Sequence, residues 1–188
     1  MTDSPDRHIL IARRRAFTRP GYVSYAEAGF DGPWVSPYQQ SCGSTCGPVL
    51  ISYNWLDAPS ARTRKVELMR LGYLPDMLFN RVLDRALADA GLARNQIYLT
   101  HAFHLLPATR SAQVPRRDIE ASFDAITRHE VAGRPVIALG RAAQSACCRF
   151  GIPHLPVSHP SARGANLRSK AAQITMALQN LSHLEHAA

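Results

Sequence analysis

Short apolar runs, separated by longer amphipathic segments, recur four times along this chain. They cover residues 48–54, 96–101, 136–140 and 154–158. Runs of this length are typical of buried strands, and the first one ends in polar residues at Ser52-Tyr53-Asn54. We therefore predict four strands. The second run continues into residues 101–107, where we predict a loop that carries two histidines.

The segments between these runs carry helical patterns. Residues 60–71 begin at a capping-type serine, and residues 76–90 repeat apolar side chains at helical spacing before Gly91. Further helices are predicted at residues 116–131, 141–150 and 163–183. Strands that alternate with helices predict an α/β protein, a three-layer α/β/α sandwich around a central four-stranded, mostly parallel sheet.

Ligands of such sheets bind beyond the carboxyl ends of the strands. That rule predicts one crevice formed by segments that are distant in sequence, residues 53–57, 100–104, 140–141 and 159–164. The length of 188 residues fits a single domain over residues 1–188. We expect residues 1–45, which are rich in Pro, Gly and Ser, to form an N-terminal arm or short helix and a loop packed on that domain.

The composition indicates the cellular location of the protein and the kind of partner that it binds. No uncharged apolar run reaches about 18 residues, and the first seven residues lack the apolar core of a signal peptide. We therefore expect a cytoplasmic protein without a membrane partner. The formal net charge of +8, carried mainly by arginine, favours a polyanionic partner, because guanidinium groups match phosphate geometry. Arg13, Arg14, Arg15 and Arg19 either contact phosphates or form a solvated basic face.

The four cysteines are too few for a secreted disulfide scaffold, so we interpret them as reduced thiols. Cys42 and Cys46 are separated by three residues, and Cys147 and Cys148 are adjacent, so neither pair has the usual Cys-x-x-Cys spacing of a metal site. Neighbouring cysteines on a helix also point in different directions. We expect no metal, and interpret the cysteines as small buried apolar side chains.

The most pronounced candidate chemistry lies where the fourth apolar run ends, at Val157-Ser158-His159-Pro160-Ser161. Pro160 fixes its own φ and favours an extended conformation for His159, so the imidazole is presented on a stiff corner. A histidine held in this way can donate a hydrogen bond to developing negative charge. The alternative is an ordinary surface turn.

Several segments together resemble the uracil-DNA glycosylase superfamily, from about Val49 to Leu178. The sequence from Arg134 to Ala143, followed by His159-Pro160-Ser161, is similar to the third strand, the following helix and the His-Pro-Ser signature of that family. Residues 82–92 and 97–101 are similar to its helix and second strand. The first signature, Gly, any residue, Asp, Asn or Ala, then Pro, is matched by Ser52-Tyr53-Asn54-Trp55, without the Gly and the Pro.

The resemblance implies a monomeric, monofunctional glycosylase of DNA base-excision repair that flips uracil out of the DNA and needs no cofactor. His159 would donate to the uracil O2 and Asn54 would position the attacking water. His101 replaces an Asn that contacts the base edge, so the resemblance implies a base preference that extends from uracil to other deaminated bases. Tyr73 is the first choice for the aromatic that stacks on the base, with Phe79, Tyr53 and Trp55 as alternatives.

The same resemblance implies that Ser161 and Arg163 belong to a loop that enters the minor groove. Arg168 and Lys170 would contact phosphates. The partner would be DNA with uracil or abasic sites, and the protein would lie with the nucleoid when bound. Two other functions stay open: a non-catalytic protein of this fold that binds uracil or abasic DNA, and a nucleotide-binding or sugar-transferring α/β enzyme, although no Gly-rich phosphate fingerprint occurs.

Overall fold

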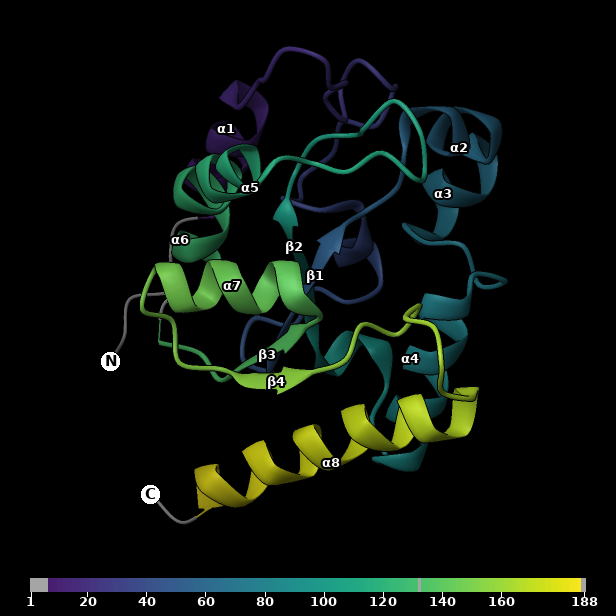
Figure 1. The fold of residues 1–188 in the computed structure, drawn as a ribbon, viewed down its shortest axis with the longest axis vertical. Helices are drawn as coiled ribbons and strands as arrows, with labels where there is room; N and C mark the ends of the chain where they lie inside the picture. The colour runs from purple at the N-terminus through teal and green to yellow at the C-terminus, as the bar shows by residue number, and fades with distance from the viewer. Residues whose placement is uncertain (1–6, 132, 187–188) are drawn as a thin grey trace.

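A computed structural model describes residues 7–131 and 133–186 of the chain (Figure 1). Within them, a sheet of four parallel strands runs through the centre of the molecule in the order β2-β1-β3-β4. The strands are β1 (Val49–Asn54), β2 (Tyr98–Phe103), β3 (Val136–Leu139) and β4 (Leu155–Val157). The predicted order along the chain and the parallel pairing are confirmed.

Successive residues of the central strand β1 serve opposite layers, because side chains alternate across a sheet. Val49 and Ile51 pack with one helical layer, whereas Leu50 packs with the other. All three are fully buried. The near-continuous apolar sequence of the strand follows from this double burial, and the three-layer α/β/α sandwich predicted from the sequence is confirmed.

Figure 1 shows the sheet between two groups of helices. One group comprises α5 (Arg116–Ser122), the π-helical turn η3 (Phe123–Thr127), α6 (Arg128–Glu130) and α7 (Arg141–Arg149). The other comprises α4 (Leu78–Asp89) and α8 (Leu167–His186), which pack against each other. The remaining helical segments are α1 (Arg7–Ala16), η1 (Pro37–Gln40), α2 (Ala58–Thr63), α3 (Lys65–Leu71) and η2 (Arg94–Gln96).

Several element boundaries differ from the prediction. The expected helix at 60–71 is two helices broken at Arg64, and its capping residue is Asp57, whose Oδ1 accepts a hydrogen bond from the Ser60 amide at 3.0 Å. Strand β2 starts and ends two residues later than predicted, because its pairing with β1 extends to Phe103. The last helix starts at Leu167, since Gly164 has a φ of +99° that no helix accommodates.

The N-terminal segment contains the expected short helix. Leu10 and Ile11 of α1 are buried in a small cluster with Val35 and Ile126. Arg14, also buried, donates to Asp31 Oδ1 at 2.9 Å and to the backbone oxygens of residues 32 and 34. One arginine of the basic cluster therefore has a structural role, which differs from the predicted phosphate contact or solvated basic face.

The burial of the four cysteines differs from the prediction for two of them. Cys42 and Cys147 are buried, as expected for small apolar side chains, but Cys46 and Cys148 are exposed, which corrects that interpretation. Residues 7–131 and 133–186 contain no group of three or more His, Cys, Asp or Glu arranged to hold a metal ion.

In the same residues, every helix is too short or too polar to cross a bilayer.

A buried carboxylate ties the sheet to the N-terminal segment and to α6. Glu130, only 2% exposed, accepts hydrogen bonds from Tyr98 Oη at 2.6 Å, Thr100 Oγ1 at 2.6 Å and Gln39 Nε2 at 3.1 Å. His104 Nε2 lies 3.5 Å from Oε2, the oxygen that also accepts from Thr100. Three donors satisfy the carboxylate in place of water, which is the condition for burying such a group.

Removing this carboxylate should destabilise the fold strongly. Glu130→Ala leaves three donors buried without an acceptor, so we expect the free energy of unfolding in urea to fall by about 3–5 kcal/mol. Glu120→Ala is the matched control, because Glu120 pairs with Arg116 at the surface and its loss should cost at most about 1 kcal/mol. Equal losses in the two variants would contradict the assigned role of Glu130.

Candidate functional site

A cleft of about 620 Å³ opens at the carboxyl end of β1. It is lined by the end of β1 and the residues that follow it, by the segment that leads into α4, and by residues after β4. Its walls include Tyr38, Ser52, Tyr53, Asn54, Trp55, Asp57, Leu74, Asp76, Phe79, Arg110, His159 and Ser161. Residues 53–57 and part of 159–164 thus form the crevice, as predicted, whereas residues 100–104 and 140–141, which were expected to share it, do not line it.

His159 lies two residues beyond β4 and presses closely on the start of α7. Gly140, with a φ of +88°, precedes α7, and its amide donates to the Val157 oxygen at 2.8 Å. A Cβ atom at position 140 would lie 2.8 Å from the His159 Cβ, closer than real side chains approach. Only glycine at 140 therefore allows the imidazole to occupy its place in the cleft.

The structure defines the protonation of His159. Burial, together with the positive charge of Lys170, lowers the pKa of His159 to about 4, so the ring is neutral at pH 7. The Ser161 amide donates to Nδ1 at 3.1 Å, which makes Nδ1 an acceptor and places the proton on Nε2. This Nε2–H has no hydrogen-bond acceptor among the described residues.

Asn54, the last residue of β1, lines the same cleft as His159. Its Nδ2 donates to the Leu56 oxygen at 3.3 Å, and its Oδ1 accepts no hydrogen bond from the described residues. The amide is therefore held by its nitrogen, with an acceptor oxygen left for a ligand or water. The structure brings Asn54 and His159 together in one cleft, although they are far apart in sequence.

His101 occupies a different position from the one predicted. It lies within β2 instead of a loop, is fully buried, and is absent from the lining of the cleft. Its Nδ1 and the Ser52 Oγ are hydrogen-bonded at 2.7 Å. Burial, and then the nearby rings of His104 and His159, lower the pKa of His101 well below its usual value, so this imidazole is also neutral.

The candidate aromatic side chains separate into two groups. Phe79, Tyr53 and Trp55 line the cleft, and the Phe79 ring lies 5.5 Å from the His159 ring. Tyr73 does not line it, because its ring stacks on Tyr38 with centroids 6.2 Å apart and lies 3.6 Å from the Arg94 guanidinium. Tyr38 itself lines the cleft, and no sequence pattern had singled it out.

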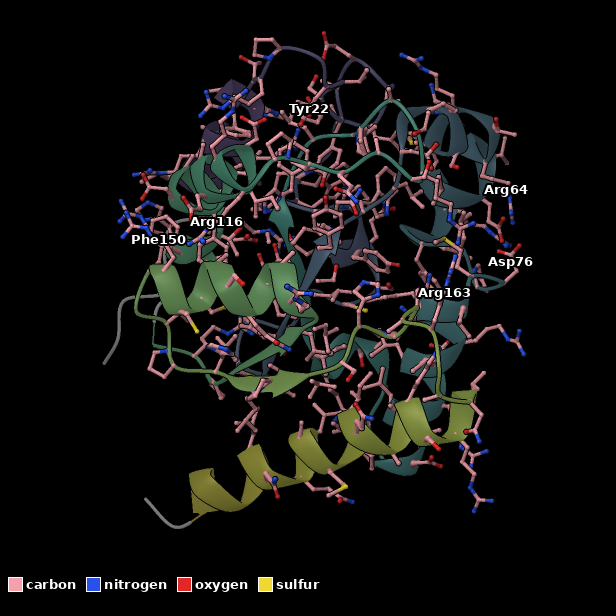
Figure 2. The ribbon with its side chains drawn as sticks, in the orientation of Figure 1. Tyr22, Arg64, Asp76, Arg116, Phe150 and Arg163 are labelled. Atoms are coloured by element: carbon pink, nitrogen blue, oxygen red, sulfur yellow. The ribbon has the colours of Figure 1, made fainter. Side chains whose placement is uncertain are left out.

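The predicted DNA-contacting residues are only partly on the surface. Ser161, Arg163 and Arg168 are exposed, and Ser161 also lines the cleft. Figure 2 shows Arg163 on the same side of the molecule as Arg64, away from Phe150. Lys170 is only 7% exposed and its charge acts on His159, so it is not the surface cation that a phosphate contact requires.

Four charged side chains at the cleft were not among the predicted site residues. Asp57 lines it while capping α2, and the sequence signal for that cap was the Asp-Ala-Pro-Ser run at 57–60. Arg64 and Asp76 form an ion pair at 3.1 Å at the rim, visible at one edge of the molecule in Figure 2. Arg110 contributes from the loop after β2.

The family model described as the uracil DNA glycosylase superfamily matches residues 35–182. The chain belongs to this superfamily. The matched region contains β1 to β4 and every residue that lines the cleft, Asn54 and His159 included. A comparison with curated proteins found no match. Membership supports a DNA glycosylase-type function that acts on DNA.

The neutral, buried His101 should make this glycosylase-family protein sensitive to acid. The unfolded chain binds a proton at this histidine as the pH falls below 6.5, whereas the folded protein does not, so the free energy of unfolding decreases with decreasing pH. Between about pH 7.5 and about pH 5, wild type should lose about 2 kcal/mol more than His101→Asn in urea unfolding. Parallel pH profiles for the two proteins would contradict this.

Proposed function

We propose that this protein is a monofunctional uracil-DNA glycosylase, which hydrolyses the N-glycosidic bond of a uracil nucleotide flipped out of DNA. The observation that carries the proposal is the neutral His159 with its proton on Nε2, in the same cleft as Asn54. Two groups of the kinds that this hydrolysis needs, a hydrogen-bond donor for the base and an acceptor for water, are thereby available at one site.

The donor serves the leaving base. As the glycosidic bond breaks, the bond electrons move to uracil, which departs as an anion while the sugar gains oxocarbenium character. A preorganised Nε2–H of His159 would donate to the uracil O2, where negative charge develops, and one such donor can lower the barrier by about 3 kcal/mol. The positive charge of Lys170, close enough to act on His159, adds positive potential at this site.

Asn54 would orient the water that attacks the sugar. Its Nδ2 is held by the Leu56 oxygen, so Oδ1 can accept a hydrogen bond from that water. An amide is too weak a base to deprotonate water, so the role is positional. Water adds to the sugar carbon after the base has begun to leave, and its proton passes to solvent or to the departing base.

The structure favours Phe79 over Tyr73 as the stacking aromatic. Phe79 lines the cleft beside His159, so a base held by His159 would contact the Phe79 ring, whereas Tyr73 is occupied by Tyr38 and Arg94. Stacking on one aromatic supplies about 1–3 kcal/mol per base. Arg163 and Ser161, exposed at the cleft side, would contact the DNA beside the flipped nucleotide.

A non-catalytic protein that binds uracil or abasic DNA is the second candidate function. The observation that favours it is the absence of the Gly and Pro of the first signature, whose positions are taken by Ser52 and Trp55. Tight binding to uracil-containing or abasic oligonucleotide with no abasic product would select this alternative. Release of free uracil would select the glycosylase.

Loss of either polar group in the cleft should slow the reaction strongly. His159→Ala and Asn54→Ala should each reduce single-turnover release of uracil by about 100-fold or more, measured by alkaline cleavage and gel analysis of a uracil-containing oligonucleotide. His154→Ala is the control, because the His154 ring donates to the Ile152 oxygen outside the cleft. Unchanged rates in both cleft variants would refute the assignment of these residues.

The close approach of Gly140 to His159 provides a test that leaves both polar groups in place. Gly140→Ala should displace His159 and reduce the rate by about 100-fold, since small misplacements of a reacting group are costly. Gly91→Ala is the matched control, with a similar φ of +69° but open space around the added Cβ. Both variants should lose about 1–3 kcal/mol of stability, and only the first should lose activity.

A further inference from the structure

Ser52 and His101 form a polar pair at the inner end of the cleft. They are register partners across β1 and β2, and Ser52 Oγ lies 2.7 Å from His101 Nδ1. Ser52 is 2% exposed and lines the cleft, whereas His101 is fully buried behind it. Of the pair, only the serine hydroxyl is in position to meet a ligand.

We propose that Ser52 is the specificity-determining residue that donates a hydrogen bond to the edge of the bound base, and that His101 is the positioning residue that directs its hydroxyl. This inference rests on the proposed glycosylase function and deepens it. It moves the base-edge contact from β2, where His101 was expected to make it, to β1.

The direction of the hydrogen bond follows from the surroundings of His101. Its Nε2 is buried and has no hydrogen-bond partner among the described residues. A buried N–H without an acceptor is rarer in proteins than a buried acceptor without a donor, so the favoured tautomer carries the proton on Nδ1. Nδ1–H then donates to Ser52 Oγ, and the serine hydrogen is free to donate to a ligand in the cleft.

The placement of Ser52 relative to His159 suits the two carbonyl groups of uracil. Ser52 is on β1 and His159 follows β4, and β3 lies between those strands. His159 packs against Gly140, which follows β3, so the two side chains enter the same cleft from neighbouring strand ends. With His159 at O2, the hydroxyl of Ser52 would donate to O4 across the ring.

A substrate pair that differs at the O4 edge of the base tests this contact. Oligonucleotides would carry either uracil or pyrimidin-2-one, which has hydrogen in place of O4 and no hydrogen on N3, and kcat/KM would be measured for both with each preparation. The ratio of the two values is independent of the fraction of folded enzyme. Leaving-group differences between the bases are common to all variants, so a change in the ratio reports a contact with this edge of the base.

Ser52→Ala should lower the preference for uracil by up to about 10-fold, the effect of one lost hydrogen bond. His101→Leu should lower it similarly, and the double variant should show no further decrease because the pair acts as a unit. His101→Asn should preserve the preference, since an amide N–H can donate to Ser52 Oγ from nearly the place of Nδ1. This rescue separates a positioning role from a merely structural one.

The outcomes distinguish this inference from the proposed function. If Ser52→Ala slows both substrates equally and leaves the ratio unchanged, Ser52 does not contact O4 and the inference is overturned, while the glycosylase assignment stands. If wild type releases neither base, the proposed function itself fails. Should Ser52→Ala fail to fold, His101→Leu and His101→Asn still decide the inference, because an equal ratio in both would overturn it.

Discussion

Parallel pairing of β1, β3 and β4 is the constraint on which the cleft depends. It brings the carboxyl ends of strands that are about 100 residues apart in sequence to one edge of the sheet, and with them Asn54 and His159. Parallel strands need helical crossovers that cover both faces, and the layers around α4 and α8 and around α5 and α7 supply this cover. The same burial that stabilises the sheet removes water from the inner end of the cleft.

Removal of water sets the charge state of the site. The protein carries a net charge of +8, yet both imidazoles nearest the cleft are neutral, because burial disfavours their charged forms. A neutral His159 with its proton on Nε2 can donate to a developing anion without having to release a proton first. Positive charge is instead held by Lys170 close to His159, and by arginines such as Arg110 at the cleft wall.

Much of this arrangement could be predicted from the sequence, for a physical reason. Buried strands have short apolar runs, and parallel topology then places residues such as Asn54 and His159 at a common edge. The orientation of side chains within that edge could not be predicted. Tyr73 lies outside the cleft because its ring stacks on Tyr38 and contacts the guanidinium of Arg94, two residues from distant segments. The burial of Lys170 on α8 likewise depends on how that helix packs against α4.

The departures from the family signatures also show that side-chain contacts could not be predicted from the sequence. In the sequence, Ser52 and His101 are two separate replacements, of a glycine and of an asparagine that the family carries at the matching positions. In the structure they are a single contact, in which each polar group supplies the partner that the other needs when it is buried.

Trp55 stands in place of the signature proline, and a side-chain hydrogen bond compensates for the missing proline ring. Its indole Nε1 donates to the Gly72 oxygen at 2.9 Å, which ties the segment after β1 to the turn that follows α3. A proline would restrict this segment through its own backbone, whereas Trp55 restricts it through a buried side chain. The segment after β1 is therefore braced by a buried side chain instead of a proline ring, and Asn54 lines the cleft.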